Sequence, residues 1–156
     1  MNLIFKRIYL QKDVLRRESV AMFLEGVGLA LEDDCEIAVC AYWQGEIVGC
    51  GSLAGNVLKC IAVSPVLQGE GLSLKLLTEL LTLAYELNRS ELFLFTKPQN
   101  RLLFSGAGFW PIAQAGELAY CVAHRAAIAI RQQGPISPLL LHRWSVAEFR
   151  AWWKKC

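Results

Sequence analysis

Apolar residues near the start of the chain follow two different spacings. Residues 2–9 alternate between apolar and polar side chains, as expected of a strand. Residues 13–31 instead carry apolar side chains at the spacing of a helix, at Val14, Leu15, Val20, Phe23, Leu24 and Val27. These patterns predict a strand followed by one or two helices.

Three β-rich runs come next. Residues 36–43 and 46–53 are separated only by Gln44 and Gly45, which is typical of a tight hairpin. Residues 57–63 form a third run, which is reached through a glycine and an asparagine and ends at a Ser-Pro pair. We therefore predict three antiparallel strands side by side.

The spacing returns to that of a helix after residue 68. One face of residues 69–87 is lined by leucines, at Leu72, Leu76, Leu80, Leu83 and Leu87, which predicts a core-facing helix. A strand over 91–96, a helix over 98–107 and strands over 109–113 and 117–123 complete the pattern. This order of elements predicts an α/β fold, with a mixed central sheet and helices on both faces.

Length and composition favour a folded domain over a disordered chain. The 156 residues are 54% hydrophobic and 19% charged, which is more apolar than a typical soluble domain. The uncharged stretch 102–116 is short for a membrane span and is interrupted by two glycines and a proline. The formal net charge of +2 gives no reason to expect nucleic-acid binding. We expect a soluble protein that binds neither a membrane nor a nucleic acid.

Charge is distributed unevenly along the chain. Residues 124–156 hold six basic residues and one acidic residue, a net charge of +5, whereas residues 1–123 carry −3. We predict one domain over residues 1–123, followed by a basic, tryptophan-rich segment over 124–156 that is not an independent domain. Two roles stay open for that segment: packing its aromatic face on the domain, or contacting a partner or an anionic surface.

Residues 58–77 are the stretch most informative about chemistry, because a strand runs through a glycine-bearing turn into a helix. Gly69 and Gly71 allow the backbone to approach a ligand closely, and the N-terminus of the helix favours a phosphate or pyrophosphate. The alternative is a tight turn without a ligand. No Gly-Lys-Ser/Thr follows, which excludes a Walker site, and a Rossmann fingerprint would need a third glycine.

The same stretch resembles motif A of the GCN5-related N-acetyltransferase (GNAT) superfamily, whose Gln/Arg-x-x-Gly-x-Gly/Ala loop binds the pyrophosphate of coenzyme A. Gln68, Gly71 and Ser73 occupy the three marked positions. Residues 61–65 resemble the strand along which that family lays the pantetheine arm, and residues 100–109 resemble its helix that ends in Gly-Phe. The resemblance covers about residues 1–123.

The resemblance implies the acyl-CoA N-acyltransferase fold and a site for acetyl-CoA or a CoA-like thioester, without a metal. It implies that the cofactor is bound by residues of the strand and the loop: Ile61, Ala62, Val63, Gln68, Gly69, Glu70, Gly71, Leu72, Ser73 and Leu74.

A narrower resemblance is to the N-terminal part of the citrate lyase ligase family, carried by residues 58–86, the run LFLFTKP and the Gly-Phe helix. Enzymes of that family use ATP and acetate to acetylate a thiol on the acyl-carrier subunit of citrate lyase. The thiol belongs to a prosthetic group derived from dephospho-coenzyme A. This resemblance implies that the carrier subunit is a partner, besides a small-molecule thioester.

Two departures leave the catalytic residues unassigned. Acyl transfer to an amine needs a base and an acid, and in the superfamily a tyrosine commonly sits four residues before the glycine of Gly-Phe. Phe104 stands there in this chain, and Lys59 stands where a carboxylate base would be sought. Catalysis by positioning and by backbone polarisation of the carbonyl remains an alternative to a module that only binds. The acceptor substrate stays open, as does a pure interaction domain.

The segment from about residue 117 onward departs from the citrate lyase ligase pattern. That family continues into a nucleotidyltransferase domain with an Asn-Pro-Phe-Thr-x-Gly-His type of motif, and these 156 residues contain no such motif. We therefore expect no ATP-dependent ligation by this polypeptide alone. The abrupt change in charge suggests a truncated or frame-altered version of the family.

The cysteines and histidines do not indicate a metal site. The cysteines show neither Cys-x-x-Cys pairs nor the density of a disulfide scaffold, and His124 and His142 have no partner at ligand spacing. We expect the cysteines to be buried structural thiols, with a reactive thiol at Cys60 as the alternative. The N-terminus carries no export signal, so we expect a cytoplasmic protein.

Overall fold

The computed structural model describes residues 2–69, 71–89, 92–96, 101–115 and 118–123. It divides the chain into two compact units, residues 1–92 and 93–156, and each is described here by itself. The basic segment 124–156, with both histidines and three of the five tryptophans of the chain, lies outside the described residues. Within the described part, no helix is long and apolar enough to cross a membrane.

The first unit opens with strand β1 (Ile4–Tyr9) and helix α1 (Val14–Gly26). Asp13 caps the helix, because its carboxylate accepts a hydrogen bond from the Arg16 backbone N–H at 3.1 Å. Of the one or two helices predicted within residues 13–31, one forms; it ends at Gly26, and Gly28 takes a left-handed φ of +83°. Val14 is 70% exposed, because α1 buries only later residues of its apolar pattern, Val20 and Leu24.

Strands β2 (Ile37–Trp43), β3 (Glu46–Ala54) and β4 (Val57–Val63) confirm the three predicted antiparallel strands. β1 pairs with β2 in the antiparallel sense and extends this sheet. The predicted hairpin turns at Gln44 and Gly45, which have φ values of +53° and +80°. Positive φ at both central residues is what a type I′ turn requires, and its twist matches that of the flanking strands.

Helix α2 (Leu72–Glu86) confirms the predicted core-facing helix but begins three residues later than predicted. Gly71 takes a left-handed conformation and therefore forms the N-cap instead of a helical turn. Four of the five leucines in the predicted stripe are buried, whereas Leu87 follows the last turn and is 39% exposed. A short 3₁₀ turn, η1 (Pro65–Leu67), lies between β4 and the loop that leads to α2.

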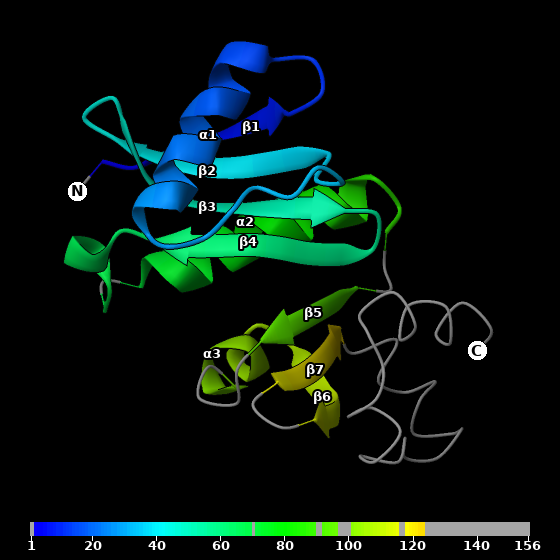
Figure 1. Ribbon diagram of the computed structural model, residues 1–156. Helices are drawn as coiled ribbons and strands as arrows, with labels where there is room; N and C mark the ends of the chain where they lie inside the picture. Colours follow the sequence, from blue (N-terminus) through cyan, green and yellow to red (C-terminus); the bar gives the residue numbers. More distant parts are fainter. Residues whose placement is uncertain (1, 70, 90–91, 97–100, 116–117, 124–156) are drawn as a thin grey trace. The chain divides into compact units, whose positions relative to one another are not determined.

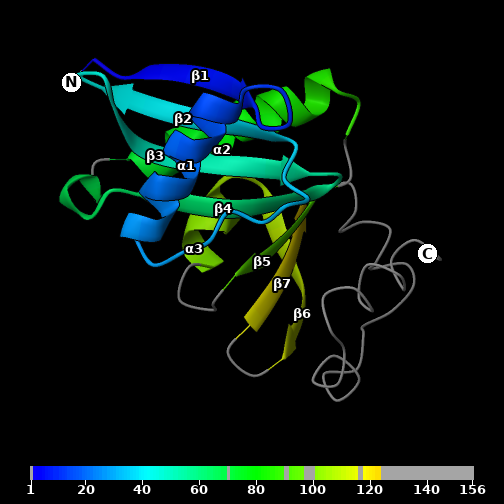
Figure 2. The ribbon, with the colours of Figure 1, turned by 45° about the horizontal axis from the view of Figure 1, so that its top comes forward.

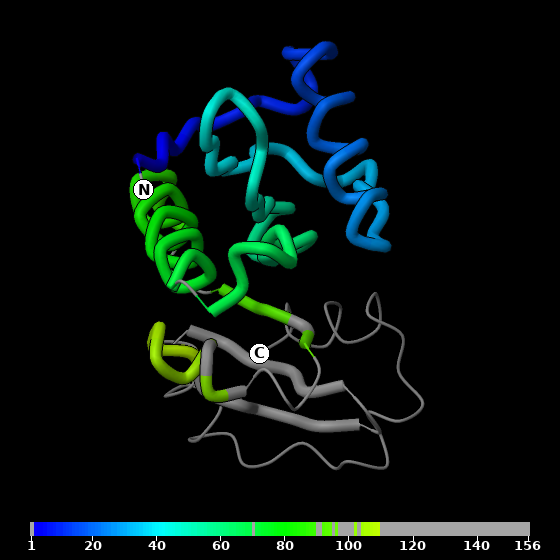
Figure 3. The backbone as a smooth tube through the Cα atoms, turned by 90° about the vertical axis from the view of Figure 1, so that its left-hand side faces the viewer, coloured from blue at the N-terminus to red at the C-terminus, as the bar shows by residue number. Residues whose placement is uncertain are grey.

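Two helices cover opposite faces of the sheet in the first unit, as Figures 1 and 2 show for α1 and α2. Figure 3 views the same arrangement from the side, with α2 and α1 flanking the strands. The alternating directions of successive residues along β3 explain how both helices pack on the same strand. Cys50 belongs to the core cluster that includes Val20 and Leu24 of α1, whereas Cβ atoms on Gly49 and Gly51 would meet leucines of α2. Adjacent residues of a strand point to opposite faces.

The second unit contains strand β5 (Phe93–Thr96), helix α3 (Arg101–Gly106) and strands β6 (Phe109–Ala115) and β7 (Leu118–Ala123). β7 pairs with both β5 and β6 in the antiparallel sense. The predicted start of the second-unit helix at Pro98 lies outside the described residues. The predicted order of strands and helices is thus confirmed from β1 through β7.

Candidate functional site

The glycine-bearing turn lies between β4 and α2, as the sequence indicates. Gly69 and Gly71 have φ values of +88° and +77°, a region that other residues enter only with strain. An added Cβ at either glycine would meet no atom within 4 Å. The glycines are therefore required by the path of the backbone, and they leave open space around the loop.

The N-terminus of α2 presents backbone donors that the helix does not use. The first intrahelical bond of this turn runs from the Lys75 N–H to the Gly71 carbonyl at 3.3 Å. The N–H groups of Leu72, Ser73 and Leu74 precede that bond and have no helical acceptor. Gly71 offers no side-chain cap, and the helix dipole adds positive potential at this end. This combination favours an anionic group.

The predicted loop residues are not equivalent in the structure. Gln68, Gly69 and Gly71 are exposed, whereas Leu72 is 2% exposed and anchors α2 in the core. Leu72 therefore has only its backbone N–H to offer a ligand. Leu74 is exposed and lines a hollow of about 740 Å³ with residues of β1 and α2. Ser73 is half-buried, and Glu70 lies outside the described residues.

The strand that carries Ile61, Ala62 and Val63 contains a β-bulge at Cys60 and Ile61. Cys50 is opposite Ala62 and Ser52 is opposite Lys59, so that Gly51 alone faces two residues of β4. Cys60 takes a φ of +54°, which is uncommon for a residue other than glycine. Ala62 and Val63 are buried, and Ile61 is half-buried. The bulge interrupts the ladder at the start of the predicted cofactor strand.

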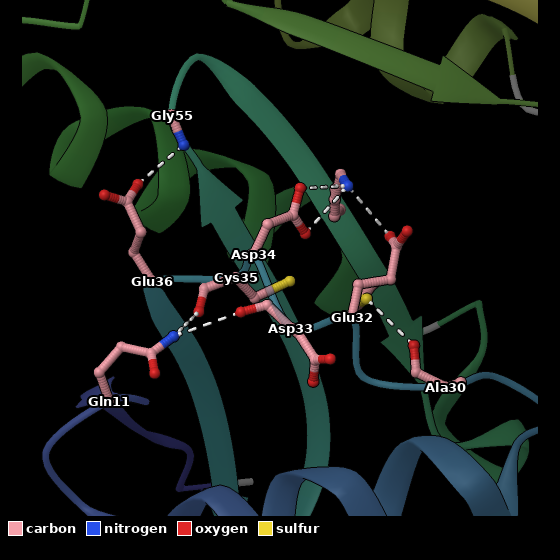
Figure 4. A network of polar contacts seen from close by, with 10 residues as sticks. Gln11, Ala30, Glu32, Asp33, Asp34, Cys35, Glu36 and Gly55 are labelled. Carbon is pink, nitrogen blue, oxygen red and sulfur yellow. Dashed lines mark hydrogen bonds and ion pairs between the residues drawn. The ribbon is translucent and has the colours of Figure 1, made fainter. Parts of the chain in front are cut away.

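An acidic loop before β2 is tied to β4 beside the bulge. The Lys59 ammonium lies 2.8 Å from an Asp34 carboxylate oxygen and 3.3 Å from one of Glu32. Figure 4 shows these acidic residues and Cys35 grouped at the loop, with a dashed line from a sulfur to the Ala30 carbonyl. That bond runs from the Cys60 thiol and measures 3.4 Å. Lys59 therefore holds the loop on the sheet and is 12% exposed.

Burial of the cysteines confirms the expected structural thiols at three positions. Cys35, Cys40 and Cys50 are buried, and burial raises the pKa of Cys40 to about 12. Cys60 is different, because it is half-buried and its pKa is lowered to about 7, chiefly by a hydrogen bond from the Cys35 thiol. The sequence holds one signal for this pair: each cysteine follows a charged residue, Asp34 before Cys35 and Lys59 before Cys60, and the two charges are opposite. We did not connect the two cysteines in the sequence analysis.

The two residues that stand in place of the expected acid and base, Phe104 and Lys59, both make packing or ionic contacts within the protein. Phe104 is 5% exposed and stacks edge-to-face on Phe109, with 6.2 Å between ring centroids. Lys59 is engaged by the acidic loop. Among the residues that the structure describes, no group of three or more His, Cys, Asp or Glu side chains is arranged to hold a metal ion.

Known proteins share the sequence and the fold of these elements. The model of the acetyltransferase (GNAT) family matches residues 5–109. A relative from Klebsiella pneumoniae, "[Citrate [pro-3S]-lyase] ligase", is 70% identical over 119 residues, which are 76% of this chain and 35% of the relative. This chain thus spans about a third of the length of that relative.

Solved structures share the fold at low sequence identity. An acyl-CoA N-acyltransferase from Pseudomonas aeruginosa aligns with a TM-score of 0.70 and 13% identity, covering 78% of this chain and 99% of that one. Escherichia coli ElaA aligns with a TM-score of 0.68 and 14% identity, covering 77% and 99%. The predicted α/β fold of acyl-CoA N-acyltransferases is confirmed by these likenesses.

Proposed function

This chain belongs to the acetyltransferase (GNAT) family, and we propose that it binds coenzyme A or a CoA-like thioester at the N-terminus of α2 and along the end of β4. The observation that carries the proposal is the left-handed Gly71, which forms an N-cap without a side chain and opens onto free space. A pyrophosphate placed there accepts hydrogen bonds from the unused amides of the first helical turn.

The pantetheine arm would follow residues Ile61 to Val63, which lead directly into η1 and the glycine loop. A CoA thioester needs a polar end for its phosphates and an extended backbone for the amides of its arm. β4 and the α2 N-terminus supply these in sequence within one unit of the chain. Gln68, before the glycines, and Ser73, in the first turn of α2, carry side-chain hydrogen-bonding groups that could bind the phosphates.

The reaction proposed for this site is transfer of an acetyl group from the thioester to an amine or a thiol. An attacking nucleophile adds to the thioester carbonyl, and the coenzyme A thiolate leaves with the electron pair of the carbon–sulfur bond. Positioning and backbone donors to the carbonyl oxygen would supply the catalysis. Phe104 offers no proton for the leaving thiolate, because a phenyl ring carries no acidic hydrogen, and the ring instead packs on Phe109.

A second candidate is a module that holds the arm without catalysis, and the same packing favours it. Both Phe104 and Lys59 are committed to contacts within the protein. The 70% identity to a citrate lyase ligase supports a CoA-like prosthetic arm as the ligand, presented by the acyl-carrier subunit of citrate lyase. We assign to these 156 residues only the thioester-binding part of that relative's reaction, and no ATP-dependent step.

Thermal unfolding with acetyl-CoA, coenzyme A and dephospho-CoA tests the site, because a ligand of the native state raises Tm. We expect a rise for wild type that increases with ligand concentration. Gly71→Glu should abolish the rise through charge and bulk at the pyrophosphate. Gly55→Ala is the matched control, since Gly55 also has a positive φ and open space but lies at the other end of β4.

The outcomes separate the candidates. If none of the three compounds at millimolar concentration raises Tm, both candidates are wrong and the glycine loop is an unliganded turn. A retained rise in Gly71→Glu would place the phosphates elsewhere. With binding established, release of free thiol from acetyl-CoA in the presence of amine or carrier-thiol acceptors identifies an acyltransferase, whereas binding without release identifies the module.

A further inference from the structure

Two cysteines 25 positions apart meet where the acidic loop crosses β4. Cys35 is the second residue before β2 and is fully buried. Cys60 forms part of the β4 bulge, is half-buried and packs against the core cluster that contains Cys35. Each thiol shifts the pKa of the other, upward for Cys35 and downward for Cys60. Both cysteines are free thiols.

The residues beside each cysteine hold the pair in place. Lys59, which precedes Cys60, binds both carboxylate oxygens of Asp34, which precedes Cys35, at 2.8 Å and 3.1 Å. The Gln11 amide donates to the Cys35 carbonyl at 3.2 Å and anchors the other side of the loop. On β4, the Cys50 thiol lies 3.6 Å from the Cys60 carbonyl, which fixes the bulge. The two thiols are thus positioned from both sides.

We propose that Cys60 and Cys35 form a thiol–disulfide exchange site for low-molecular-weight disulfides, in which Cys60 attacks and Cys35 resolves. The Cys60 thiolate attacks one sulfur of the small disulfide, whose sulfur–sulfur bond breaks and releases one thiolate. Cys35 then loses its proton to solvent and attacks the Cys60 sulfur, releasing the second thiolate. The protein gains one disulfide, and the small disulfide is reduced to two thiols.

The assignment of the two roles follows from exposure and charge. Cys60 is the more exposed sulfur, and the ammonium of Lys59 and the bond from Cys35 favour its thiolate. The hydrogen bond to Cys60, then burial and the negative charge on Cys60, raise the pKa of Cys35 and keep it protonated in the resting pair. A mixed disulfide on Cys60 removes that bond and that charge, so that only burial and the Asp34 charge still oppose ionisation of Cys35, which then attacks.

Cys40 and Cys50 provide an internal contrast, because they are directly opposite each other on β2 and β3. Both are fully buried, and burial raises the pKa of each thiol. A small disulfide cannot reach them without local unfolding. Proximity of two cysteines is therefore not enough for exchange with a small disulfide. The half-buried position of Cys60 distinguishes the proposed pair from Cys40 and Cys50.

Glutathione disulfide is the probe, used on the full 156-residue protein. Digestion with trypsin and Glu-C places the four cysteines of this unit in separate peptides, residues 33–36, 37–46, 47–59 and 60–70. We expect glutathione to appear first on peptide 60–70, followed by a link between 60–70 and 33–36. A glutathione adduct that persists on Cys60, or a link from 60–70 to another peptide at an equal rate, would overturn the proposal.

Three variants make the order of steps visible. Cys35→Ala should stop the reaction at the Cys60 adduct, and Cys60→Ser should leave peptide 33–36 unmodified. Cys40→Ser is the matched control and should not change the rate of the 33–36 to 60–70 link. If modification of Cys60 is no faster than that of Cys40 in wild type, which needs no variant to fold, the site is not an exchange site. None of these outcomes depends on coenzyme A binding.

Discussion

A methyl group on Gly51 of β3 would lie 2.4 Å from Cδ1 of Leu80 on α2. Carbon atoms pack at about 3.5–4.0 Å, so that glycine here lets the helix approach the sheet. Ile61 on β4 would lie 3.3 Å from the same methyl group. The depth at which α2 sits, and with it the position of its N-terminus, thus depends on a missing side chain.

Gly51→Ala should lower the stability of the protein by about 1–3 kcal/mol, because overpacking displaces Leu80. Chemical denaturation measures this loss. The double variant Gly51→Ala with Leu80→Val should lose less than the sum of the two single variants, since Val lacks the clashing atom. Gly26→Ala is the control, because its Cβ would meet nothing within 4 Å. If the stability losses of the two single variants simply add in the double variant, the clash with Leu80 is not the cause of the loss in Gly51→Ala.

Glu36 should make stability depend on pH. Its carboxylate accepts bonds from the Gly55 N–H at 2.7 Å and Arg89 at 2.8 Å, and these lower its pKa. A lowered pKa means that the stabilisation is present above the ordinary value and is lost as pH falls through the folded pKa. At pH 7, Glu36→Gln should cost about 1 kcal/mol, a small value because the side chain is 44% exposed.

The difference between wild type and Glu36→Gln should shrink as the pH is lowered below about 4.5, the ordinary pKa of the carboxyl. Urea denaturation at a series of pH values measures it. Glu86→Gln is the control, since Glu86 pairs with Arg7 at an exposed position and should leave stability nearly unchanged. A difference that is constant with pH would contradict the assigned role of the Glu36 carboxylate.

Ser52→Ala should stabilise the protein. The Ser52 hydroxyl is fully buried in β3 and has no hydrogen-bond partner among the described residues. An unsatisfied buried hydroxyl costs about 1–3 kcal/mol, and its removal should raise Tm by about 2–12 °C, at about 2–4 °C for each kcal/mol. Ser19→Ala removes an exposed hydroxyl bonded to the Leu15 carbonyl and should change little. An unchanged or lower Tm for Ser52→Ala would reveal a partner that the structure does not show.

Alkylation of Cys60 should follow an unusually low thiol pKa. Its pKa is lowered to about 7 from the ordinary 9.0, first by the Cys35 hydrogen bond, then by a hydrogen bond from the Glu32 backbone and by the Lys59 charge, while burial and the Glu32 charge act in the opposite direction. The rate with iodoacetamide should rise through pH 7 in wild type, as measured on peptide 60–70. In Cys35→Ala the inflection should move toward the ordinary value. An inflection near 9 in wild type would contradict the proposed contact.

Phe104→Tyr tests whether a phenol can restore the missing acid. The ring is buried against Phe109, so that the added hydroxyl needs a partner or loses its hydration. We expect a loss of about 1–3 kcal/mol and no increase in thiol release from acetyl-CoA. Phe104→Leu, which removes the aromatic contact without adding a polar atom, separates packing from polarity. A faster reaction in Phe104→Tyr would show that the hydroxyl reaches the thioester.

Local patterns in the sequence determined the order of elements, the hairpin at Gln44 and Gly45, and the glycine loop before α2. Each depends on the spacing or the backbone freedom of residues that are neighbours in the chain. The late start of α2 was missed because apolar spacing does not report that Gly71 is left-handed. The end of the first helix at Gly26 was not predicted, because apolar residues continue past Gly26 at helical spacing while the backbone turns away.

Only the tertiary structure decided which distant residues meet. The bulge at Cys60 arises from the pairing of β4 with β3. The bonds of Lys59 to Asp34 and the Cys35–Cys60 pair join residues that are 25 positions apart. Their contact depends on strand register and on where the loop crosses β4, and a shift of one residue would turn each side chain to the other face. The sequence determined that a glycine turn precedes a helix; the fold decided that Cys60, on the strand before that turn, lies beside Cys35 of a distant loop.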